Sequence, residues 1–110
     1  MEIIMPRGDL RTIQFGVSQN GLPYIDFDEI YFTVKKTVTN KTFVLQKKLS
    51  DGGITLEGNV FQFIIEPEDT EELEYGKYPF DICLVKEGVI KETSVGSLTL
   101  TSEVTFAENE

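Results

Sequence analysis

Hydrophobic and polar residues alternate through most of the chain. In residues 30–38 (IYFTVKKTV), Ile30, Phe32 and Val34 share one face, and the residues between them point to the other. This period of two is typical of a β-strand with one buried face. Further runs that are alternating or continuously apolar occupy 10–17, 42–48, 54–56, 60–65, 78–85, 89–95 and 97–106. The pattern therefore predicts about seven short antiparallel strands, with the last two runs forming one or two of them.

Turn-forming residues separate the predicted strands. Asn, Asp and Gly accept the positive backbone φ angles that tight turns require. Such residues occur where one predicted strand ends and another begins, at Asn20-Gly21, Asn40-Lys41, Asp51-Gly52-Gly53, Glu57-Gly58-Asn59 and Glu87-Gly88. We expect a turn at each of these positions, so that neighbouring strands pair antiparallel.

Three segments do not fit the strand pattern. Residues 66–76 are the one helix-like stretch, and a proline near their start favours a single helical turn. Pro6 and Gly8 interrupt regular structure near the amino end, so we expect residues 1–9 to be a loose lead-in. Residues 107–110 are expected to be a tail.

The composition agrees with an all-β domain. The chain has 110 residues, and its Val, Ile, Thr, Phe and Tyr residues together number 42 against a single Ala, Ala107. Branched and aromatic side chains pack well on a pleated sheet, and strands spaced about eight to twelve residues apart are typical of a sandwich. We expect residues 1–110 to form a single immunoglobulin-like β-sandwich. The predicted core consists of Ile13, Phe15, Ile30, Phe32, Val34, Phe61, Phe63, Tyr78, Phe80, Ile82 and Leu98.

The composition also excludes several functions. The chain has no His, which removes imidazole bases and the commonest transition-metal ligand. Its one Cys, Cys83, lies in an apolar run, where a buried and unreactive thiol is expected. The net charge of −9 disfavours a nucleic-acid partner. No apolar run is long enough to span a membrane, and the amino end lacks the pattern of a signal peptide.

Short motifs and acidic clusters add no predicted catalytic, cofactor-binding or metal-binding residue. Asp26, Asp28 and Glu29 form a small cluster, and residues 66–74 hold six acids, but both are expected to be solvated loops. Arg7-Gly8-Asp9 matches an integrin-binding tripeptide, and residues 40–42 match a glycosylation sequon. Three-residue motifs occur often by chance, so we interpret both as coincidences.

The distribution of charge suggests an assembly surface. Half of the positive charges lie in the second predicted hairpin, whereas acids gather at 66–74 and 103–110. Opposite charges on one molecule can steer head-to-tail assembly, while lysines on an edge strand can instead prevent aggregation. Both interpretations remain open. The candidate assembly residues are Lys35, Lys36, Lys47, Lys48, Glu71, Glu72 and Glu74.

Tyr78 is a candidate for a structural role. It follows an acidic turn and a glycine, and it opens a predicted strand. This arrangement is typical of the tyrosine corner of immunoglobulin-like sandwiches, in which the hydroxyl binds upstream backbone. We therefore predict that Tyr78 stabilises the fold and takes no part in chemistry.

Several segments resemble a family of phage domains. They are FTVKK at 32–36, QKKLSDGG at 46–53, PEDTEELEYGKYPFDICLV at 67–85 and KETSVGSLTLTSEVT at 91–105. From about Leu10 to Thr105, the chain resembles the amino-terminal domain of phage baseplate upper proteins and related tail-associated proteins of Gram-positive hosts. The motif positions are Phe32, Lys35, Asp69, Thr70, Leu73, Gly76, Tyr78, Asp81, Gly96, Val104 and Thr105.

The resemblance implies an immunoglobulin-like sandwich with a structural role in a virion and no catalytic residues. Such a module would be assembled in the cytoplasm of a bacterial host and would contact other virion proteins or copies of itself. The alternative is a module that binds carbohydrate or another part of a host surface. Its stacking platforms would be Tyr24, Tyr31 and Tyr75, because the chain has no Trp. An enzyme is the least supported class.

Overall fold

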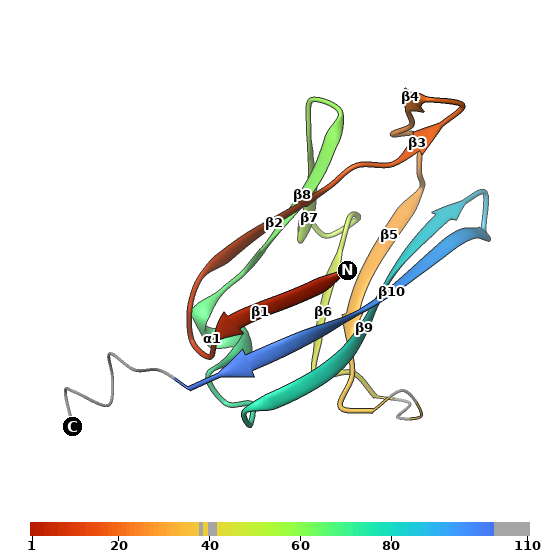
Figure 1. Cartoon of the computed structure of the whole chain (residues 1–110). Coiled ribbons are helices and arrows are strands. Elements are labelled where there is room, and N and C mark those ends of the chain that lie inside the picture. The colour runs from red at the N-terminus through yellow and green to blue at the C-terminus, as the bar shows by residue number, and fades with distance from the viewer. Residues whose placement is uncertain (38, 40–41, 103–110) are drawn as a thin grey trace.

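The computed structural model describes residues 1–37, 39 and 42–102, and these residues form two facing β-sheets (Figure 1). The larger sheet has five strands in the order β1-β10-β9-β5-β6. Their bounds are β1 Glu2–Pro6, β10 Val89–Thr101, β9 Gly76–Lys86, β5 Glu29–Val34 and β6 Leu45–Lys48. The smaller sheet has three strands in the order β2-β8-β7. Their bounds are β2 Arg11–Phe15, β8 Val60–Ile65 and β7 Ile54–Glu57.

Two small elements complete the fold. A hairpin of β3, Ser18–Gln19, and β4, Leu22–Pro23, lies in the connection between β2 and β5. The helical turn α1, Pro67–Thr70, follows β8, as the sequence predicted. The expected Asn40-Lys41 turn and the tail at 107–110 lie outside the described residues.

The strand pairing is that of an immunoglobulin-like sandwich. Every pair within the two sheets is antiparallel except β1 with β10, which is parallel. The two sheets are unequal, with five and three strands. The predicted fold class is therefore confirmed. The last two predicted runs, expected to form one or two strands, form one long strand, β10, whose pairing register with β9 shifts between Ile90 and Glu92.

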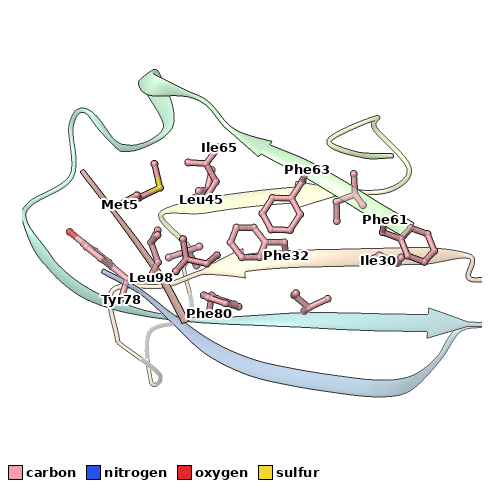
Figure 2. Close-up of a cluster of buried hydrophobic side chains, with 14 of the residues drawn as sticks. Met5, Ile30, Phe32, Leu45, Phe61, Phe63, Ile65, Tyr78, Phe80 and Leu98 are labelled. Atoms are coloured by element: carbon pink, nitrogen blue, oxygen red, sulfur yellow. The ribbon is translucent and has the colours of Figure 1, made fainter. Parts of the chain in front are cut away.

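Aromatic side chains from both sheets meet in the core (Figure 2). The rings of Phe32 and Phe63 stack across the sheets with centroids 4.2 Å apart, and Phe80 packs against Phe32 at 5.0 Å. Of the predicted core, Ile13 and Phe15 are only partly buried, and they pack against its edge. The other predicted core residues are buried, so alternation located the core correctly.

The prediction that residues 1–9 form a loose lead-in is wrong. Residues 2–6 form β1, which lies beside β10 in Figure 1, and both Ile3 and Met5 are buried in the core. Pro6 does not prevent this strand, because a proline is tolerated at the end of an edge strand that needs no further ladder bond. Gly8 follows the strand and has a positive φ of 84°.

Candidate functional site

The face of the five-stranded sheet that points away from the core is the candidate site, and we name it the outer face. Its position follows from strand register, because residues directly opposite each other on paired strands point the same way. Tyr31, Cys83 and Thr93 form one row across β5, β9 and β10. Thr33, Asp81 and Val95 form the next row. None of these side chains belongs to the hydrophobic core, and within the described part of the chain no element covers the face.

Apolar side chains are exposed on this face. Val95 is 75% exposed and Ile90 is 62% exposed, although both lie within the regular strand β10. A shallow hollow of about 420 Å³ lies between β5, β9 and β10. Its lining includes Val95, Pro79 and the backbone of Gly96. The outer face therefore offers apolar contacts around a depression.

Gly96 is required by close packing at the border of this hollow. A Cβ atom at this position would lie 2.3 Å from the carbonyl oxygen of Met1 and 2.6 Å from Cζ of Phe80. The Met1 carbonyl accepts a hydrogen bond from the Ser97 amide at 3.1 Å. The missing side chain thus lets β1 and the Phe80 ring approach β10.

The environment of Cys83 differs from the one expected from the sequence. We expected a buried thiol, but this residue is partly exposed on the outer face. The reason is alternation along β9, where Ile82 and Leu84 point into the core and Cys83 points away. Together with Val95 and Ile90, it was not identified as a site residue. Alternation with Ile82 and Leu84 would have placed Cys83 outward, whereas the outward position of Val95 depends on the register shift between Ile90 and Glu92.

The candidate lysines divide between two locations. Lys48 pairs with Tyr31 and so belongs to the outer face, and Lys35 lines the hollow. Lys36 follows the end of β5 and is exposed. Lys47 instead forms an ion pair with Asp69 of α1, with Nζ and Oδ2 2.7 Å apart. The Lys47 and Asp69 side chains are only 16% and 17% exposed, so this lysine has an internal structural contact.

The candidate acids lie between α1 and β9. Glu71, Glu72 and Glu74 are all exposed, and the structure places none of them in an ion pair with a described residue. Acidic and basic segments nevertheless touch within one molecule, because Asp69 from the same acidic run binds Lys47. Among the predicted assembly residues, Lys47 is thus the one engaged internally, and the role of the others stays a prediction.

Tyr78 forms the predicted tyrosine corner. Its hydroxyl donates a hydrogen bond of 2.7 Å to the carbonyl oxygen of Glu74, four residues upstream. The ring is buried among the core residues at the start of β9. Burial, and then the negative charge of Glu74, raise the pKa of the Tyr78 hydroxyl. The structure thus contains the predicted bond from this hydroxyl to upstream backbone.

The Arg7-Gly8-Asp9 tripeptide is held against this corner. The Arg7 guanidinium donates hydrogen bonds to the Leu73 carbonyl and to the Tyr75 hydroxyl, each at 3.1 Å, and lies 4.2 Å from the centre of the Tyr75 ring. The Gly8 amide donates to Oγ1 of buried Thr70 at 2.8 Å. Arg7 and Gly8 therefore make structural contacts within the chain. The Arg7 guanidinium already lies over the ring of Tyr75.

The cluster of Asp26, Asp28 and Glu29 binds protein groups. Lys86 Nζ lies 3.1 Å from Asp26 and 3.8 Å from Asp28, and the Glu87 amide donates to Asp28. A hydrogen bond with Asp26 raises the pKa of the Lys86 ammonium group, more than partial desolvation lowers it. No group of three or more potential metal ligands gathers in the described residues.

Glu29 links β5 to the connection between β6 and β7. Its carboxylate accepts hydrogen bonds from the Ser50 amide at 2.9 Å and the Ile30 amide at 3.1 Å. Desolvation acts to raise the pKa of the Glu29 carboxyl, but hydrogen bonds, chiefly from Ser50, outweigh it and lower that pKa. This acid therefore has a structural role.

The comparisons support the fold and no named family. The chain matches no family model and no curated protein. In the part of the chain that the structure describes, no helix has the length and apolar character of a membrane span. One similar solved structure is a candidate glycoside hydrolase from Bacteroides vulgatus ATCC 8482, at 13% identity and a TM-score of 0.44. That match covers 92% of this chain but only 17% of the hydrolase chain.

A second solved structure resembles the whole domain. It is the NK cell receptor Nkp44, a triggering partner in natural cytotoxicity, at 11% identity and a TM-score of 0.51. The match covers 91% of this chain and 96% of that chain. Identity this low bears on the fold alone. The sheet order and this likeness together show that the chain is an immunoglobulin-like β-sandwich.

Proposed function

We propose that this chain is a structural module of a phage or prophage virion, associated with the tail or baseplate, that works by protein–protein assembly. The observation that carries the proposal is the uncovered outer face, where apolar side chains are exposed beside lysines. An apolar surface with a polar border is typical of a face that another protein covers. The resemblance of the sequence to tail-associated phage domains supports the virion setting.

The charges of the chain favour a second copy as the partner. Lys35 and Lys48 border the outer face, and Lys36 is exposed beside it. The exposed glutamates of residues 71–74 supply the opposite charge on a different part of the same molecule. A contact between these two surfaces joins unlike faces, so it can close a ring or build a filament. Charge complementarity of this kind raises the rate and specificity of association.

The outer face is tested by placing a charge on it. We expect Val95→Asp to abolish association in sedimentation velocity experiments, because an unpaired carboxylate would have to be desolvated in the contact. Leu22→Asp is the matched control, since Leu22 is 68% exposed in β4, which belongs to a separate two-stranded sheet. Equal association of both variants and wild type would exclude the outer face as the contact surface. A wild-type chain that stays monomeric would exclude self-association.

The native thiol gives an independent measurement. Cys83 lies on the outer face and is partly exposed, so it can be alkylated without introducing a new residue. We expect iodoacetamide to react more slowly with the assembled chain than with the Val95→Asp variant. The same rate in both would show that assembly leaves this face open.

The virion setting is tested by immunogold electron microscopy. Antibody raised against the chain is applied to particles released by inducing the source culture. Label on tails or baseplates would support the proposal. Intact particles without label would overturn the virion role, whatever the association state of the purified chain.

A further inference from the structure

A pocket distinct from the outer face lies at one end of the sandwich. It is bounded by the connection from β2 to β5, which carries the β3–β4 hairpin, and by the far part of the β9–β10 hairpin. Figure 1 shows both hairpins at this end of the molecule. The pocket has a volume of about 360 Å³. This volume lies within the usual range for small-molecule sites, roughly 300–1,000 Å³.

Two aromatic rings form an apolar wall. Tyr24 packs edge-on against Phe27 with centroids 5.0 Å apart, and Phe27 contacts the core ring of Phe61 at 6.1 Å. The Tyr24 amide also donates to the Val17 carbonyl at 2.8 Å. Tyr24 and Phe27 are therefore held in place by the core and by backbone, although they lie in a connection between strands.

An irregularity in β10 supplies the opposite wall. The register with β9 shifts between Ile90 and Glu92, so Lys91 is an extra residue without a partner on β9. In a regular strand, consecutive side chains point to opposite faces, whereas a bulge redirects one of them. Lys91 and Glu92 consequently both line the pocket. A cation and an anion thus face the aromatic wall.

The polar groups of the pocket are available to a ligand. Lys91 and Glu92 are exposed, and neither side chain forms a hydrogen bond or ion pair with another described residue. Ser18 and Gln19 add a hydroxyl and an amide from β3. Together these side chains can both donate and accept hydrogen bonds around a single apolar wall.

We propose that this pocket binds one unit of a saccharide. A pyranose ring presents an apolar C–H face, which suits the Tyr24 and Phe27 wall, and hydroxyl groups at its edge that both donate and accept. The neighbouring positive and negative charges of Lys91 and Glu92 disfavour a phosphate, which would meet the carboxylate. The mixed lining also disfavours a lipid chain, because burial under it would remove the hydrogen bonds between the polar groups and water.

The experiment is an NMR titration of the purified ¹⁵N-labelled chain with separate solutions of glucose, galactose, rhamnose and N-acetylglucosamine. We expect at least one sugar to shift amide signals of residues 18–27, 91 and 92, with the outer-face residues Tyr31, Thr33 and Val95 unaffected. Glu92→Gln should weaken that binding by about tenfold, because it removes the carboxylate that accepts hydrogen bonds from the sugar hydroxyl groups. The variant should fold, since an exposed side chain can be changed without disturbing the fold. Tyr24→Ala should weaken it at least as much.

Tyr31→Ala is the matched control, because Tyr31 lies on the outer face and its loss should leave sugar affinity unchanged. Absence of shifts with all four sugars would overturn the proposal, as would equal binding by wild type and Glu92→Gln. If Tyr24→Ala does not fold, Glu92→Gln still decides the result. The proposal does not rest on a virion role, so failure of either leaves the other standing.

Discussion

The hydroxyl of Tyr78 is a single group whose contribution to stability can be measured. It donates to the Glu74 carbonyl at 2.7 Å, while the ring is buried. Tyr78→Phe keeps the ring and removes the bond, so we expect the free energy of unfolding to fall by about 1 kcal/mol. Urea denaturation measures this change. Tyr31→Phe, on the outer face, should have little effect, and equal losses in both variants would contradict a special role for the corner.

Gly96 is predicted to tolerate no side chain. A Cβ atom there would meet backbone and an aromatic ring at 2.3 Å and 2.6 Å, so we expect Gly96→Ala to cost about 1–3 kcal/mol of folding free energy. Gly16→Ala is the control, because a Cβ atom at Gly16 meets no atom within 4 Å. Thermal unfolding of the two variants gives the comparison. Equal melting temperatures would mean that β1 and Phe80 can move aside at little cost.

Glu29 gives a pH-dependent contribution to stability. Its pKa is lowered in the folded chain from the ordinary 4.5. A lowered folded pKa stabilises the fold above the ordinary pKa, and this contribution is lost as the pH falls through the folded value. We therefore expect Glu29→Gln to be less stable than wild type at pH 7. The difference should close as the pH falls below 4.5, as followed by urea denaturation at several pH values.

The first strand shows how one element contributes to the core. Met5 of β1 is fully buried, whereas its neighbour Ile4 points outward and is 53% exposed. Met5→Ala should cost about 2–5 kcal/mol, because it leaves a cavity between the sheets. Ile4→Ala should change the stability by less than about 0.5 kcal/mol. Similar stabilities of the two variants in guanidinium would show that β1 is dispensable for the core.

Elements with a clear period were predictable from sequence, and those fixed by distant contacts were not. The alternation in β5 and β9 and the turn at Asn20-Gly21 identify the sandwich without knowledge of its neighbours. The short β1 has only two core positions, and its pairing depends on β10 at the other end of the chain. Local composition around Pro6 and Gly8 therefore predicted a loop.

The candidate sites were predictable only in part, for the same reason. Tyr24 was identified as a possible stacking platform because the chain has no Trp and Tyr24 lies outside the predicted core, but its pocket needs the irregularity at Lys91. A register shift depends on both strands and leaves no clear mark in the sequence. Likewise, the ion pair of Lys47 with Asp69 joins residues of β6 and α1, which no spacing rule brings together.

At the scale of the whole molecule, two adjacent lysines should separate stability from assembly. Lys47→Ala breaks a largely covered ion pair and should cost about 1–3 kcal/mol of stability without a direct effect on the outer face. Lys48→Ala should leave stability nearly unchanged and weaken association. The difference from wild type should be largest at low salt, where surface charges are least screened. Denaturation and sedimentation on both variants give the comparison. If Lys48→Ala associates as wild type does, charge steering by this residue is excluded.

The parallel pairing of β1 with β10 has a consequence for the chain as it is synthesised. Glu2 pairs with Ser97, which is 95 positions later. Because ribosomes add roughly 5–20 residues each second, the partner of β1 is made roughly 5–20 s after β1 itself. During this interval Ile3 and Met5 have no β10 to cover them. The nascent chain therefore presents an uncovered apolar segment that a chaperone can bind, and the last long strand to be made is the one that removes it.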